Sequence, residues 1–181
     1  PAVWRGPMVS GALQQMLNNT CWQDLDYLII DLPPGTGDIQ LTLAQKIPVC
    51  GAVVVTTPQD VALLDVTKAM SMCTRVKVPI LGIVENMSTH ICSNCGQHDS
   101  IFGNGGALTL SQQHAVPLLG VLPLQRTVCE LADRGQPIVS AMPQDPYSLV
   151  FFDIAQQISQ QIAKLPRDYS VPLARIVIEE A

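Results

Sequence analysis

The chain has 181 residues, of which 48% are apolar, 14% charged and 4% aromatic, and its formal net charge is -5. A chain of this length suits one domain with a core of aliphatic side chains, which favours α/β layers over a β-sandwich. Because the ten Lys and Arg residues form no basic stripe and no apolar run approaches the ~20 residues of a membrane helix, we expect a cytoplasmic protein that binds neither nucleic acid nor membrane.

Predicted helices and strands alternate along the chain. A helix over 7–20 precedes the first apolar segment, 26–31, which predicts a buried strand. Short β-branched segments bounded by turn residues predict further strands over 51–57, 78–85 and 117–122. Stretches of helical length lie between and after the strands, at about 38–46, 61–76, 107–114 and 145–164. This alternation predicts an open, doubly wound, mostly parallel α/β sheet with helices on both faces.

Two other stretches have no such periodicity. Residues 86–106 are punctuated by Gly and Asn and form a long loop, and loops of this length in compact domains usually carry function. Residues 165–181 form a tail interrupted by Pro. A parallel sheet of this type normally has a strand before the first helix, and that position is empty here. Because the sequence also begins at Pro1 without an initiator Met, we expect the chain to be cut from a longer protein.

A carboxylate and a Gly-Pro loop follow the predicted strand 26–31. Asp31 stands at the carboxyl end of the strand, where a carboxylate can hold the Mg²⁺ of a nucleotide or cap the next turn. The loop that follows contains Gly35 and Gly37, whose backbone freedom suits an amide that engages and releases a γ-phosphate. Asp38 either contributes to this nucleotide site or caps the predicted helix after it.

The run from Asp26 to Asp38 resembles the Walker B and switch II region of the Mrp/ApbC branch of the deviant P-loop ATPases, which also includes MinD and ParA. Three more segments agree with that branch in order and spacing, namely 4–8 (WRGPM), 55–59 (VTTPQ) and 82–88 (GIVENMS). The resemblance covers about residues 2–160. It implies a P-loop NTPase fold of the MinD/ParA type, ATP and Mg²⁺ as ligands, and catalytic roles for Asp31 and Gly35.

A base pocket is expected at the same edge of the sheet. Asn86 follows a predicted strand, and the resemblance implies that its amide recognises adenine; the alternative is a turn-forming Asn that bonds its own backbone. Pro123, after the last predicted strand, is expected to complete the pocket wall. No lysine follows a glycine, so the phosphate-binding pattern G-x-x-x-x-G-K-[ST] is missing. We therefore expect 1–164 to be an ATPase-like domain without its Walker A segment, inactive in hydrolysis as it stands.

Cys92 and Cys95 lie in the long loop, followed by Gly96, and two thiolates at this spacing can converge on one metal through a tight turn. A cubane cluster or a structural zinc takes four ligands, and a two-fold dimer would pair two such loops. The resemblance implies a bridging four-iron, four-sulfur cluster. A bridging zinc, a redox pair and idle thiols remain open. The other cysteines are expected to be buried packing residues, and the two loop histidines to be solvated: Cys21, Cys50, Cys73, Cys129, His90 and His98.

The resemblance thus implies a homodimeric, ATP-linked carrier that transfers a 4Fe-4S cluster to apo iron-sulfur proteins. One alternative is a positioning ATPase of the MinD or ParA type, which would need a basic patch or an amphipathic C-terminal helix. The tail, with Pro166 and Pro172, has neither feature. The other alternative is a zinc-bridged dimer without a catalytic role.

Overall fold

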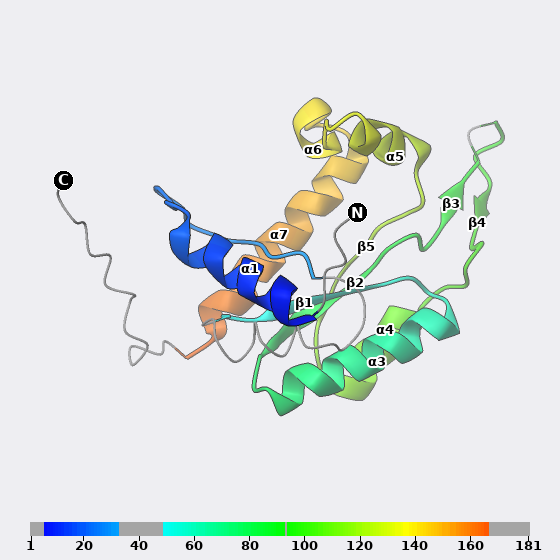
Figure 1. Ribbon diagram of the computed structural model, residues 1–181. Helices are drawn as coiled ribbons and strands as arrows, with labels where there is room; N and C mark the ends of the chain where they lie inside the picture. The colour runs from blue at the N-terminus through cyan, green and yellow to red at the C-terminus, as the bar shows by residue number, and fades with distance from the viewer. Residues whose placement is uncertain (1–5, 33–48, 93, 167–181) are drawn as a thin grey trace.

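Three parallel strands in the order β1-β2-β5 form the central sheet of the computed structural model, which describes residues 6–32, 49–92 and 94–166 (Figure 1). The strands are β1 (Ala52–Thr56), β2 (Ile80–Glu85) and β5 (Leu118–Val121). At the end of central strand β2, Glu85 pairs with Thr56 on one side and with Val121 on the other. The carboxyl ends of all three strands therefore share one edge, which is where open parallel sheets bind ligands.

Helices cover both faces of the sheet (Figure 1). Helices α3 (Asp60–Arg75) and α4 (Gly106–His114) pack on one face, and α7 (Pro146–Lys164) packs on the other. A hydrophobic core lies on each face of the sheet. Neighbouring residues of β2 belong to different cores: Ile83 to the one under α3 and α4, and Val84 to the one under α7. Successive side chains of a strand point to opposite faces, so a strand covered on both faces is apolar at almost every position.

The remaining described elements are helices outside the sheet core and a small hairpin. They are α1 (Gly6–Asn19), α5 (Arg126–Asp133), α6 (Ile138–Ala141), β3 (His90–Ile91) and β4 (His98–Asp99). Helix α7 begins with a defined cap, because the Asp145 side chain accepts a hydrogen bond from the Tyr147 amide at 2.9 Å. Among the described helices, none combines the length and apolarity needed to cross a bilayer.

Most of the predicted elements are confirmed. The strands predicted over 51–57, 78–85 and 117–122 correspond to β1, β2 and β5. The helices predicted over 7–20, 61–76, 107–114 and 145–164 correspond to α1, α3, α4 and α7. The helix predicted over 38–46 lies outside the described residues. Helices α5 and α6 and the hairpin were not predicted, because elements this short show too few turns or residues for a periodic pattern.

The strand predicted over 26–31 is wrong. Residues 21–32 adopt neither helix nor strand, and Ile29 is 90% exposed. Apolar character predicts that a segment prefers burial, but a strand also needs a neighbouring strand to exchange hydrogen bonds with. No described strand pairs with this segment, so its apolar side chains stay at the surface.

Candidate functional site

The loop between β2 and α4 carries the cysteine hairpin, defined here as residues 90–99 with strands β3 and β4. Its base is bound to the residues that follow β5. The amide and the hydroxyl of Ser88 both donate to the Leu122 carbonyl, at 3.0 and 3.1 Å. The Leu124 amide donates to the Thr89 carbonyl at 2.8 Å. The hairpin is thus attached at the carboxyl edge of the sheet and extends away from α3 and α4 (Figure 1).

The end of the hairpin is a tight turn that contains both cysteines. The Cys92 amide donates to the Gln97 carbonyl at 2.9 Å, and the Gly96 amide donates to the Cys92 carbonyl at 2.8 Å. Gly96 has a φ of 70°, in the left-handed region that glycine adopts without strain. Cys92 is half-buried and Cys95 is exposed. The two sulfur side chains are therefore presented together on one short turn.

The turn also favours the ionised form of one thiol. Hydrogen bonds from the backbone of Cys95, then from the backbone of Asn94, and then from the Cys95 side chain lower the pKa of the Cys92 thiol. A thiol with a lowered pKa is a thiolate over a wider range of pH, and the thiolate is the form that binds metals. Soft thiolate ligands select iron–sulfur clusters, zinc or copper(I). Protons therefore compete less with such a metal at Cys92 than at an unperturbed thiol.

The described residues near the turn add no further set of ligands. His90 pairs across the hairpin with Asp99 and is half-buried, whereas His98 is exposed. Within the part of the chain that the structure describes, no group of three or more His, Cys, Asp or Glu side chains is placed to hold a metal. One copy thus offers two sulfur donors, whereas a cubane cluster or a structural zinc takes four ligands.

Of the other four cysteines, all predicted to be buried, one is buried and three are exposed. Cys73 is a buried residue of α3, and burial raises the pKa of its thiol. Cys21, Cys50 and Cys129 are exposed, so the prediction is wrong for these three. Cys21 and Cys50 lie outside helices and strands, and Cys129 lies on α5, which has no buried residue. An apolar sequence context did not distinguish these surface positions from the core.

A second feature of the same edge is an open hollow of about 310 Å³ beside the end of β1. Its lining residues come from β1, α3 and the end of β2 and are Val55, Thr56, Thr57, Ala62, Asp65, Val66 and Asn86. The Asn86 side-chain oxygen accepts a hydrogen bond from the Met87 amide at 2.9 Å, and Met87 has a φ of 57°. Asn86 thus has the turn-forming role that the sequence left as an alternative, and its amide nitrogen remains as a donor.

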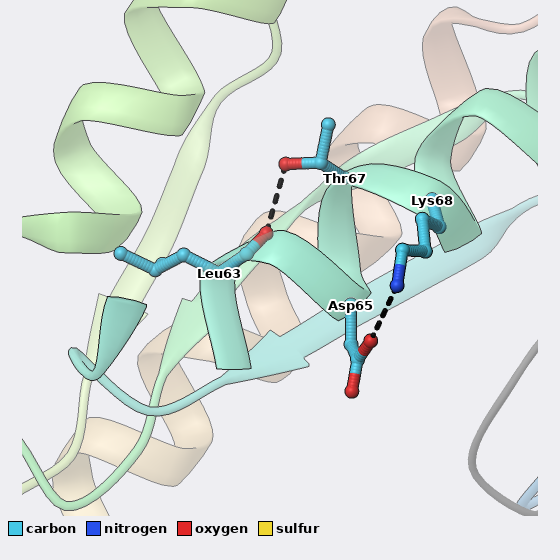
Figure 2. A network of polar contacts seen from close by, with 4 residues as sticks. All are labelled: Leu63, Asp65, Thr67 and Lys68. Atoms are coloured by element: carbon cyan, nitrogen blue, oxygen red, sulfur yellow. Dashed lines mark hydrogen bonds and ion pairs between the residues drawn. The ribbon is translucent and has the colours of Figure 1, made fainter. Parts of the chain in front are cut away.

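The α3 wall of the hollow carries one carboxylate, Asp65. Asp65 forms an ion pair with Lys68 at 3.2 Å, and one turn of the helix is joined by a bond from the Thr67 hydroxyl to the Leu63 carbonyl at 2.8 Å (Figure 2). The Asp65 and Lys68 side chains are 73% and 69% exposed, so water screens this pair and it contributes little to stability. Because no Lys or Arg is among the lining residues, the hollow suits a neutral base better than a phosphate.

A slightly larger hollow, of about 360 Å³, lies at the opposite edge of the sheet. It is lined by Thr74, Lys77, Val78, Pro79, Ile80, His114 and Val116. It holds none of the residues predicted to be functional, and the amino ends of parallel strands are not where such sheets bind ligands. We therefore place the candidate site at the carboxyl edge.

The structure brings together some of the predicted site residues and separates others. Cys92 and Cys95 share one turn, and Asn86 lines the hollow. Pro123 lies between the two residues that hold the base of the hairpin and is not among the lining residues of the hollow. Asp31 is exposed and follows no sheet strand. Gly35 and Asp38 lie outside the described residues.

Two polar residues of the site were not predicted. Glu85, at the end of β2, and Ser88, at the base of the hairpin, are 3% and 4% exposed. A polar residue at or shortly beyond the end of an apolar strand was the available signal, since such residues lie at the carboxyl edge of a sheet, where ligands bind. Their burial and their partners, however, follow from the tertiary fold.

Comparison with known proteins gives a consistent picture. The family of NUBPL iron-transfer P-loop NTPases, within the ParA group, matches residues 1–159. The iron-sulfur cluster carrier protein of Salmonella typhimurium is 57% identical over 160 residues, which cover 88% of this chain and 43% of the relative. The iron-sulfur cluster transfer protein NUBPL of Dictyostelium discoideum is 45% identical over 168 residues, or 93% of this chain and 52% of the relative. The chain thus spans about half the length of these relatives.

Solved structures agree on the fold. A nucleotide-binding protein from Archaeoglobus fulgidus, in complex with ADP and with cobalt detected, matches with a TM-score of 0.67 and 37% identity over 80% of this chain and 58% of that one. The cell division ATPase MinD of Pyrococcus furiosus matches with a TM-score of 0.59 and 21% identity over 86% of this chain and 59% of that one. The second likeness concerns the fold alone.

Proposed function

The chain belongs to the family of NUBPL iron-transfer P-loop NTPases, and from that premise we propose that it binds an iron–sulfur cluster through Cys92 and Cys95 and passes it to apo iron-sulfur proteins. The observation that carries the proposal is the turn at the end of the cysteine hairpin. It presents two sulfur donors outside the core, on a segment whose base is hydrogen-bonded to the residues after β5, with the pKa of Cys92 lowered. An accessible, two-donor site suits a cluster that is cargo and has to leave again.

The number of donors supports a dimer. Each copy contributes two cysteines in the turn, and a four-iron, four-sulfur cluster takes four. A two-fold axis brings the same surface of both copies together, so two hairpins would supply the complete set. A cluster held in this way lies between two copies and is released when they separate, which is the property that transfer requires.

Anaerobic reconstitution with iron and sulfide tests this proposal. We expect about four irons and four sulfides per two chains, the Mössbauer signature of a cubane cluster, and the mass of a dimer. Zinc bound at one ion per two chains, with no iron taken up, would support the zinc-bridged dimer instead. A monomer with neither metal would contradict both assignments.

We also propose that the hollow beside Asn86 receives the base of an adenine nucleotide. Its size, its lack of basic side chains and the remaining donor on Asn86 support a neutral, acceptor-bearing ligand. The similar Archaeoglobus protein, which holds ADP, supports the same ligand class. On the family resemblance we assign Mg²⁺ binding to Asp31 and sensing of the γ-phosphate to the loop at Gly35. Asp38 stays a proposed residue of the nucleotide site, and Pro123 a proposed wall residue.

The Asn86→Asp variant separates the two roles of this side chain. Aspartate keeps an oxygen for the Met87 amide but replaces the donor nitrogen with a second acceptor. We expect an intact fold and roughly three- to tenfold weaker binding of ADP, with less preference over GDP, as measured by calorimetric titration. Equal affinities for ADP in the parent protein and the variant would rule out base recognition by Asn86.

A further inference from the structure

A buried carboxylate stands where the loop 86–106 begins, and the cluster and nucleotide sites proposed above do not use it. Glu85 is 3% exposed, and its Oε2 atom accepts a hydrogen bond from the Ala107 amide at 2.8 Å, 22 positions further along the chain. We propose that Glu85 is a positioning residue that joins the two ends of the loop 86–106 and thereby fixes the cysteine hairpin relative to the sheet.

The backbone of Glu85 is a fixed point. Its carbonyl accepts a hydrogen bond from the Leu122 amide at 2.7 Å, and the amide of the next residue, Asn86, donates to the Thr56 carbonyl at 2.7 Å. The strand is therefore held on both sides at the position from which the carboxylate extends. Because Glu85 is also 3% exposed, its surroundings leave the side chain little freedom to move.

The partner amide depends on this carboxylate. The first amides of a helix have no acceptor within the helix, and a polar side chain at the N-cap normally supplies one. The N-cap of α4 is Gly105, which has no side chain and lies at a φ of 71°. Ala107 is 0% exposed, so water does not reach its amide easily. Glu85 thus supplies from a neighbouring strand the acceptor that the helix lacks.

The bond to Ala107 differs from the other attachments of the loop. Ser88 and Thr89 fix the outgoing side of the hairpin to Leu122 and Leu124. Glu85 fixes the returning side, because Ala107 lies where the loop enters α4. Without that bond, the end of the loop that leads into α4 is no longer hydrogen-bonded to the end of β2. The position of the hairpin relative to a second copy would then become less defined.

Hydrogen exchange in the cluster-free protein tests the tether, and Asp145→Ala is the matched control because Asp145 also caps a helix amide, at α7. In Glu85→Ala we expect the Ala107 amide to exchange roughly tenfold faster or more, with faster exchange at Cys92 and Gly96. Glu85→Gln keeps an acceptor oxygen and should restore most of the protection. Asp145→Ala should affect Tyr147 and leave the hairpin amides unchanged.

The expected effect of the tether on the release of iron rests on the proposed function and is measured in a separate experiment. In reconstituted protein we expect iron to pass to a chelator several-fold faster from Glu85→Ala than from Glu85→Gln or Asp145→Ala. Unchanged exchange at Cys92 in Glu85→Ala, or the same increase in Asp145→Ala, would overturn the proposal.

If Glu85→Ala does not fold, strong protection of Ala107 in both the parent protein and Glu85→Gln supports the tether, and its absence refutes it. Failure to form any cluster would contradict the carrier function. Amide hydrogen exchange in the cluster-free protein would still show whether Glu85 holds the loop in place.

Discussion

Replacing either Cys92 or Cys95 by alanine is expected to abolish cluster binding. In the proposed dimer each substitution removes two of the four sulfur donors, and the remaining two are too few to hold a cubane cluster. Both residues lie in a turn outside the two hydrophobic cores, so the sheet and helices should keep their circular dichroism. The measurement is the visible absorbance and the iron content after anaerobic reconstitution, which should both fall to background.

Cys129→Ala provides the control for this pair. Cys129 is an exposed thiol on α5, a helix outside the hairpin, and its removal should leave the iron content unchanged. The same protocol then distinguishes iron held by the turn from iron bound nonspecifically by surface thiols. Retention of the full cluster by both hairpin variants would show that the donors lie elsewhere.

Replacing Ile83 by alanine is expected to lower the free energy of unfolding by about 2–5 kcal/mol. Ile83 is 0% exposed at the centre of β2 and belongs to the core under α3 and α4 with Val54, Met70 and Leu110. Alanine leaves a cavity that these neighbours fill only in part. The measurement is urea denaturation followed by circular dichroism.

Val55→Ala on the adjacent strand is the matched comparison. Val55 is 58% exposed, and surface substitutions usually change the free energy of unfolding by no more than about 0.5 kcal/mol. A large difference between the two variants is therefore expected from burial alone. Similar losses of stability in both would mean that the sheet is not packed as described.

How far the sequence predicts this fold is clear from two apolar segments. Residues 80–85 and residues 26–31 have the same strand pattern, but the first is central strand β2 and the second adopts no regular structure. Pattern and length report the preference of a segment for burial. Whether another strand lies beside it depends on the rest of the chain, which a local window does not include.

The same limit applies to the candidate site. The spacing of Cys92 and Cys95 and the following Gly96 predicted a shared turn, because those contacts are local. The partners of Glu85 and Ser88 lie 22 and 34 positions away. Such contacts arise only when strands and loops assemble, so the turn that contains both cysteines was predicted and the buried polar residues at the base of its loop were not.

Leu122 contributes to two parts of the molecule at once. Its side chain is buried in the core beneath α7, and its carbonyl receives both hydrogen bonds from Ser88. Through these hydrogen bonds the base of the surface hairpin is connected directly to the packed core. The conformational entropy of placing the two thiols is thus lost when a single chain folds, and in the proposed dimer the association of two copies around a cluster is correspondingly less unfavourable.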